Sequence, residues 1–425
     1  MDLNNVEFTW IKNKPENWKT QRVKNHFILT KNRTESPQGY PILSLTMKGI
    51  IERDVSSNEG QLPETYNGYN LLEKDDIVFN PMDLISGWVD CSPFEGLISP
   101  SYKVLRPISE KVNIRFYTYY FQTHYKEKIF FPFGEGVHYE YRWGLGTETL
   151  NNFPIVVPPL SEQQQIVSFL DTKTSLIDSL IEKTQRKIKL LKEKRTSLIN
   201  EVVTKGLNPD VEMKDSGVEW IGEIPSHWET TKFKFKGEVI IGLSYKPENQ
   251  VDENDGVLVM RSSNVQNGKP SFHDNVYVDC EISDKLRTRE GDILICSRNG
   301  SRRLIGKNCL ITKEIEGMTW GVFMTMYRTP YYKFFYWLLN SPVFKSQSGL
   351  FLTSTINQLT VSTLENMVVP YVSDKIEQQQ IVEYLDEQTL KIDKIISIEE
   401  KRIKLLKDYR QSLISELVTG KRKVV

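Results

Sequence analysis

The chain has 425 residues, and its 55 Lys and Arg balance its 55 Asp and Glu, so the formal net charge is zero. At roughly 100 to 200 residues per domain, this length predicts two to four folding units and excludes a single small module. The neutral charge excludes a polybasic binder, so any nucleic-acid site must come from local clusters of charge. With 39% hydrophobic and 11% aromatic residues, the chain can bury sizeable cores.

Cysteine usage and hydropathy restrict the environment of the protein. The four cysteines, Cys91, Cys280, Cys296 and Cys309, form no CxxC pair, which argues against a disulfide framework or a zinc site. No stretch approaches 18 uninterrupted apolar residues, and the N-terminus has no apolar signal-peptide core. We therefore expect a soluble protein of the reducing cytoplasm, with no membrane partner.

Residues 1–160 are predicted to form a first α+β domain. Short apolar runs at Pro41–Leu45, Ile77–Phe79 and Tyr102–Leu105 are separated by Gly, Asn, Asp and Ser, the pattern of short strands with long connections. The aromatic-rich run Ile114–Thr123 favours a helix.

Residues 161–206 are predicted to form one long helix. Glu162–Lys205 contains no Pro or Gly, and at about 1.5 Å rise per residue such a helix spans about 65 Å. A coiled-coil seam recurs along it at spacings of three and four residues, so the helix needs a partner. The seam positions are Ile166, Leu170, Thr174, Ile177, Ile181, Thr184, Ile188, Leu191, Arg195, Leu198 and Val202.

Residues 207–376 repeat the pattern of the first domain. Apolar runs at Val257–Met260, Ile293–Cys296 and Phe323–Tyr327 predict strands, and Tyr331–Leu339 predicts a helix at the place that matches Ile114–Thr123. A second α+β domain is therefore expected here.

Residues 377–425 are predicted to form a second long helix that copies the first. Glu162–Thr204 aligns on Glu377–Thr419 without gaps, with 24 of 43 pairs identical. Matches upstream keep a similar offset, such as Trp10-Ile11 with Trp220-Ile221. The chain thus consists of two copies of one repeated unit. We expect the two helices to pair as an antiparallel coiled coil that separates the two domains and relates them by a pseudo-two-fold axis.

Catalytic motifs are missing from this sequence. Asn80-Pro81-Met82 fails the Asn/Asp-Pro-Pro-aromatic box expected of a DNA amino-methyltransferase, and Gly144-Leu145-Gly146 lacks the third glycine of a cofactor loop. Pro209–Lys214 spells a PD…ExK nuclease signature, but its two parts are adjacent in a linker. There is no GxxxxGK[ST] phosphate loop, and the five histidines have no metal-ligand spacing. We expect no catalytic site, cofactor or metal on this chain.

Two EQQQI-initiated helices, the VPPLSEQQQI segment and the joint LNPDVEMKDSGVEWIGEIPSHW (Leu207–Trp228) resemble the specificity subunits of type I restriction-modification systems over essentially the whole chain. The resemblance implies that each globular half is a target-recognition domain for one part of a split double-stranded DNA site. It implies that the helices are a spacer and docking surfaces for two modification (methyltransferase) subunits and, in the larger complex, restriction subunits. S-adenosylmethionine, and ATP with Mg for restriction, would then belong to those partners.

The richest candidate DNA-binding cluster follows the predicted strand Ile293–Cys296. It offers three guanidinium groups and small hydrogen-bonding side chains in one loop, and Arg can grip guanine edges bidentately or pair with phosphate. A solvated loop is the alternative. The cluster consists of Ser297, Arg298, Asn299, Ser301, Arg302 and Arg303.

Other candidates combine basic, aromatic and amide side chains in predicted loops, where packing or solvated roles remain open. In the first half they are Lys31, Arg33, Lys48, Asn80, Tyr139 and Arg142, and in the second half Tyr245, Lys246, Arg261, Asn264, Thr355 and Gln358. Because Gly39–Asp90 and Gly242–Asn299 differ greatly in sequence, the two half-sites should differ and the whole site should be asymmetric.

Two other classes of function compete with this interpretation. A coiled-coil scaffold whose globular ends bind protein or glycan ligands would explain neither the loop 297–303 nor the joint sequence. A self-contained restriction or modification enzyme would need catalytic motifs that this sequence lacks.

The neutral net charge also predicts weak DNA binding by the isolated chain and strong binding once partner subunits enclose the duplex.

Overall fold

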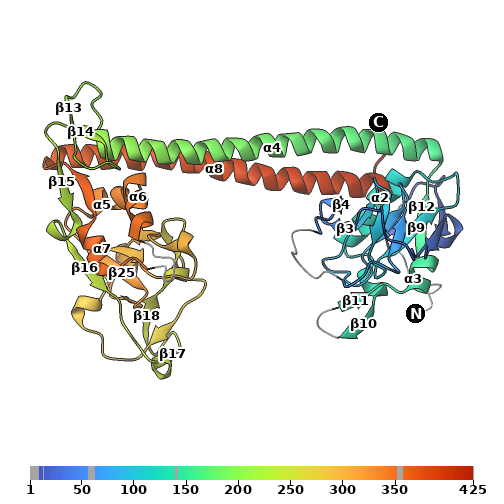
Figure 1. Ribbon diagram of the computed structural model, residues 1–425, viewed down its shortest axis with the longest axis horizontal. Coiled ribbons are helices and arrows are strands. Elements are labelled where there is room, and N and C mark those ends of the chain that lie inside the picture. The colour runs from blue at the N-terminus through green and yellow to red at the C-terminus, as the bar shows by residue number, and fades with distance from the viewer. Residues whose placement is uncertain (1–8, 13, 56–62, 139–141, 352–357, 425) are drawn as a thin grey trace. The chain divides into compact units, whose positions relative to one another are not determined.

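The computed structural model describes residues 9–12, 14–55, 63–138, 142–351 and 358–424. Their contacts divide the chain into two compact units: unit 1 comprises Met1–Gln185 with Lys401–Val425, and unit 2 comprises Arg186–Glu400. The long helices α4 (Leu160–Lys205) and α8 (Lys375–Val418) each contribute one part to either unit. The two predicted long helices are thus present, each shared between the units (Figure 1), but the second one ends at Val418 and not at residue 425.

Each unit contains a four-stranded antiparallel sheet with the same strand order. In unit 1 the order is β2 (Phe27–Thr30), β9 (Lys103–Pro107), β6 (Ile77–Phe79) and β7 (Val89–Cys91). In unit 2 it is β16 (Glu238–Ile241), β25 (Met324–Arg328), β22 (Ile293–Cys296) and β23 (Asn308–Leu310). The internal repeat read from the sequence is therefore a repeat of the fold.

The remaining elements also follow the repeat. The predicted aromatic helices are α2 (Ile114–Lys126) and α5 (Tyr332–Leu339), and a two-stranded ladder precedes each long helix. Unit 1 further contains α1 (Thr9–Lys12), β1 (Lys19–Arg22), β3 (Leu43–Thr46), β4 (Gly49–Glu52), β5 (Asn70–Leu72), β8 (Gly96–Ile98), β10 (Glu135–His138), β11 (Arg142–Gly144), α3 (Thr147–Asn152) and β12 (Pro154–Val157). Unit 2 contains β13 (Met213–Asp215), β14 (Glu223–Pro225), β15 (Glu229–Lys232), β17 (Gln250–Val251), β18 (Val257–Met260), β19 (Val265–Gln266), β20 (Lys269–Pro270), β21 (Tyr277–Val278), β24 (Thr319–Trp320), α6 (Pro342–Phe351), α7 (Val361–Asn366) and β26 (Val368–Tyr371).

A buried ion pair supports the turn before the central strand of each sheet. In unit 2, Arg328 donates from Nε and Nη2 to the two carboxylate oxygens of Asp292 at 2.8 and 2.7 Å, and Asp292 is only 2% exposed. Asp76 and Arg106 make the same bidentate pair in unit 1. This pair explains why an aspartate directly precedes β6 in the first half (Asp76) and β22 in the second half (Asp292).

The EQQQ motif anchors the start of each long helix. Glu162 accepts a hydrogen bond from Trp18 Nε1 at 2.8 Å, and Glu377 accepts one from Trp228 Nε1 at 3.0 Å. The next residue, Gln163, is completely buried and bonds to backbone groups before the helix. The motif is therefore a structural lock between helix and domain.

The two long helices pair antiparallel within each unit. In unit 2, Lys187 and Arg195 of α4 form ion pairs with Glu399 and Asp393 of α8 at 2.6 and 2.9 Å, so the partner number falls as the α4 number rises. In unit 1, Arg410 pairs with Asp178 at 3.1 Å. The predicted seam positions are buried or half-buried in both helices, which confirms the antiparallel coiled coil in each unit.

Each core incorporates the C-terminal part of one long helix. Leu413 and Leu417 of α8 pack into the core of unit 1, and Ile199 and Val203 of α4 pack into the core of unit 2. The C-terminal end of each long helix is therefore buried in the core of one unit. Within the described residues, no helix is long and apolar enough to cross a membrane.

Candidate nucleic-acid interface

Three loops of unit 2 meet at one edge of its four-stranded sheet. Strands β16 and β22 both run antiparallel to β25, with Ile241 paired to Thr325 and Cys296 paired to Met324. Both strands therefore end where β25 begins. We call this place the recognition edge of unit 2; it is formed by the loops 242–250, 297–307 and 321–323.

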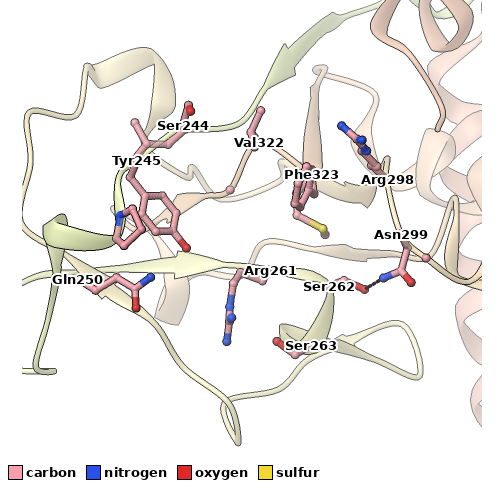
Figure 2. A pocket seen from close by; sticks show the side chains of 15 residues that line it. Ser244, Tyr245, Gln250, Arg261, Ser262, Ser263, Arg298, Asn299, Val322 and Phe323 are labelled. Carbon is pink, nitrogen blue, oxygen red and sulfur yellow. Dashed lines mark hydrogen bonds between the residues drawn. The ribbon is translucent and has the colours of Figure 1, made fainter. Parts of the chain in front are cut away.

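An open cavity of about 910 Å³ lies at this edge (Figure 2). Tyr245 and Gln250 line it from the first loop, Arg298 and Asn299 from the second, and Phe323 from the third. The turn 261–263 closes a further side. The fold therefore brings together four of the residues predicted to bind DNA, which come from three separate segments: Tyr245, Arg261, Arg298 and Asn299.

The loop 297–303 is held by its own polar side chains. Ser297 is 5% exposed and its hydroxyl donates to the carbonyl of Phe323 at 3.0 Å. Asn299 Nδ2 donates to the Ser262 hydroxyl at 3.1 Å, and Asn299 Oδ1 accepts from the Ser301 amide at 2.9 Å. Ser297 and Asn299 thus position this loop.

The arginines of this loop point to solvent. Arg298, Arg302 and Arg303 are exposed, as is Ser301, and Arg302 begins a short 3-10 helix that ends at Leu304. Beneath them, burial raises the pKa of the Cys296 thiol, so the thiol remains neutral and is a poor nucleophile. The loop offers positive charge and hydrogen-bond donors.

The turn 261–264 plays a structural part that the sequence did not reveal. Asn264 is completely buried; its amide donates to the carbonyl of Ser271 at 3.0 Å and accepts from the Arg261 amide at 2.9 Å. Its side chain therefore shapes the turn and is not available to bind DNA, contrary to the expectation from sequence. Arg261 lines the cavity, but its guanidinium is paired with Asp274 at 2.9 Å.

The other predicted residues of unit 2 lie on or beside the same edge. Lys246 is exposed and forms an ion pair with Glu248 at 3.3 Å. Gln358 forms a backbone bridge with Arg298 and so holds the loop from behind. Thr355 lies outside the described residues.

Unit 1 has an equivalent recognition edge with different side chains. Strands β2 and β6 end beside the start of β9, with Thr30 paired to Val104 and Phe79 paired to Lys103. Lys31 and Arg33 follow β2 and are exposed. The loop after β2 therefore brings two basic residues to the recognition edge of unit 1.

The loop after β6 differs from its counterpart in unit 2. Asn80 Oδ1 accepts a hydrogen bond from the Met82 amide at 3.1 Å, so its carbonyl oxygen shapes the turn. Met82 and Ile85 are exposed, and the Asp83 carboxylate accepts from the Ile85 amide at 2.8 Å. The tip of this loop thus presents apolar side chains where unit 2 presents arginines.

The hairpin formed by β10 and β11 lies next to this loop. The Leu145 amide, just after β11, donates to the carbonyl of Pro81 at 2.8 Å. Arg142 is the first residue of β11 and pairs with His138 of β10. Tyr139 lies outside the described residues, and Lys48 is exposed in the turn between β3 and β4.

Sequence inspection missed two residues of the unit 2 edge. Phe323 was assigned to a strand, but it precedes β25 and is 55% exposed. Ser262 was not among the candidates, yet its hydroxyl accepts the hydrogen bond from Asn299. A lone aromatic residue just before a buried strand is the signal that could have identified Phe323. Within the described part of the chain, no three His, Cys, Asp or Glu side chains gather as a metal site.

Comparison with known proteins agrees with this architecture. Residues 15–190 match the family described as the type I restriction modification DNA specificity domain. The type I restriction enzyme MjaVIII specificity subunit of Methanocaldococcus jannaschii is 27% identical over 64% of this chain and 63% of its own length. The putative type I restriction enzyme MjaX specificity subunit of the same organism is 23% identical over 99% of this chain and 97% of its own length.

Two solved structures share the fold. A chain from a study of complex assembly and conformational transition of the type I R-M system has a TM-score of 0.75 at 15% identity, covering 96% of this chain and 99% of that one. The HsdS subunit from Thermoanaerobacter tengcongensis has a TM-score of 0.54 at 15% identity, covering 96% and 98%.

The doubled sheet with its loop-bearing edges and the paired long helices is thus a fold shared with solved type I R-M structures. Residues 15–190 match this DNA specificity domain family, and the chain is similar over nearly its whole length to a putative type I restriction enzyme specificity subunit.

Proposed function

We propose that this chain is the non-catalytic subunit that reads a split, asymmetric site on double-stranded DNA, with one half-site for each unit. One observation carries the proposal: the two units place loops at the same edge of the same sheet, but the loop after β22 exposes Arg298, Arg302 and Arg303 whereas the loop after β6 exposes Met82 and Ile85. The same scaffold with different tips suits two different half-sites, because bases are distinguished by the groups that reach their edges.

Partners are proposed to supply the chemistry. The chain would bind two modification subunits, which carry S-adenosylmethionine, and in the larger complex restriction subunits, which use ATP and Mg. Exposed apolar residues on α8 support protein docking: Leu390 and Ile398 lie on one helical face in unit 2, and Leu405 and Tyr409 lie on one face in unit 1. The complex would act in the cytoplasm, where host and invading DNA are accessible.

The net charge of zero limits the number of phosphates that the chain alone can neutralise. Partners that close around the duplex would add contacts, so binding should become much tighter in the complex. Gel-shift titration at fixed salt, with and without the modification subunits, measures this difference. Equal affinities in the two titrations would refute the role of the partners.

The function itself is tested by sequencing methylated bases in a host that carries the gene with its modification partner. The proposal predicts methylation at one split motif with two unlike halves. Methylation by the purified chain alone, or at an uninterrupted motif, would refute it. A host with the modification gene alone is the matched control and should show no such motif.

A further inference from the structure

The backbone of Arg298 is fixed from two sides. Its amide donates to the carbonyl of Phe323 at 3.0 Å, and its backbone forms a bridge with Gln358. Neighbouring side chains secure the same loop, because Ser297 bonds to Phe323 and Asn299 bonds to Ser262. The origin of the Arg298 side chain is therefore set before any ligand arrives.

The side chain of Arg298 is also pre-positioned. Its guanidinium carbon lies 5.2 Å from the centre of the Phe323 ring, within the range of a cation–π contact. Both side chains are exposed at the rim of the cavity and lie side by side (Figure 2). Stacking on an aromatic ring restricts the guanidinium plane, which lowers the entropy that binding would cost.

Arg298 differs in this respect from the other arginine of the cavity. Arg261 is committed to Asp274, whose side chain and carbonyl both receive its Nη2. Within the described residues no carboxylate pairs with Arg298. The Arg298 donors at the cavity rim are therefore not committed to any described carboxylate and can meet an acceptor supplied by DNA.

Resting on the proposed function, we propose that Arg298, stacked on Phe323, reads a guanine in the half-site of unit 2. A guanidinium presents two parallel donors that match the O6 and N7 acceptors of guanine in the major groove. Phosphate is the competing acceptor for an arginine. A fixed, stacked fork favours the base because a planar bidentate contact needs a defined orientation, whereas phosphate accepts many.

The test uses the complex with its modification subunits and a set of duplexes in which each base pair of the site is varied, at one salt concentration. Wild-type complex should require G·C at one position of one half-site. Arg298→Ala should reduce discrimination at that position roughly tenfold to a hundredfold and leave the other half-site unchanged. Phe323→Leu should relax the same position to a smaller degree.

Arg289→Ala is the matched control, because Arg289 is exposed in the same unit but precedes β22 rather than following it. It should leave the preference at every position unchanged. Uniform weakening by Arg298→Ala across all duplexes, or relaxation at an A·T pair, would overturn the guanine assignment while leaving the proposed function intact. A wild-type complex without any sequence preference would overturn both. Should the alanine variant melt at a lower temperature, Arg298→Lys keeps the charge and removes the fork, and the same loss of guanine preference is expected.

Discussion

Replacing Gln163 with methionine removes the hydrogen bonds that attach the first long helix to its domain while keeping a side chain of similar length. Gln163 is 0% exposed. Its Nε2 donates to the carbonyls of Lys111 and Pro158 at 2.8 and 2.9 Å, and its Oε1 accepts from the Asn113 amide at 2.7 Å. At about 1 kcal/mol for each bond, the variant should lose about 3 kcal/mol of unfolding free energy.

Equilibrium unfolding in urea, followed by tryptophan fluorescence, measures this loss because the buried Trp18 ring bonds to the neighbouring Glu162. A loss of this size should also lower the melting temperature of unit 1 by roughly 6 to 12 °C. Gln164→Met is the matched control: Gln164 is the adjacent residue of the motif and is exposed, so it should cost under about 0.5 kcal/mol. Equal losses in the two variants would refute the view that EQQQ is a structural lock.

Three further predictions concern the fold. Asp292→Asn should lower the free energy of unfolding in urea by about 3 kcal/mol, because it leaves the partly buried Arg328 guanidinium without its counter-charge. Glu238→Gln, which breaks an exposed pair with Lys285, should lower it by under about 1 kcal/mol. Similar losses in the two variants would contradict this reasoning. Burial lowers the pKa of His124 to about 3, so between about pH 6.5 and pH 3 only the unfolded chain takes up this proton. The His124 contribution to stability then falls by about 1.4 kcal/mol per pH unit as the pH is lowered through this window. His124→Phe should reduce this acid loss of stability, and an unchanged pH profile would contradict it. Arg195→Asp should destabilise the helix pair by about 1 kcal/mol, and adding Asp393→Arg should recover most of it; additive losses in the double variant would rule out the direct pairing.

The helices and the repeat could be predicted because their signals are local and periodic. A buried seam position such as Leu170 is one of many at the same spacing, and Ile77–Phe79 and Ile293–Cys296 were recognised as strands from continuous apolar runs. Sharing of each long helix between the units was not predicted, because it depends on contacts between residues more than 200 positions apart.

The roles of single loop residues were harder to predict because they depend on three-dimensional neighbours. Asn264 has the composition of a DNA-contacting residue, yet the carbonyl of Ser271 and the amide of Arg261 occupy its side chain. Phe323 looked like part of a strand but supports Arg298 at the cavity. Burial and hydrogen-bond partners, which sequence patterns do not encode, separate the two cases.

Exchanging residues 1–160 for the corresponding segment of a relative with a different target tests the division of labour between the units most directly. The measurement is sequencing of methylated bases in a host that carries the exchanged chain with its modification partner. The account predicts that one half of the motif changes while the other half stays the same. A change in both halves, or in neither, would contradict it.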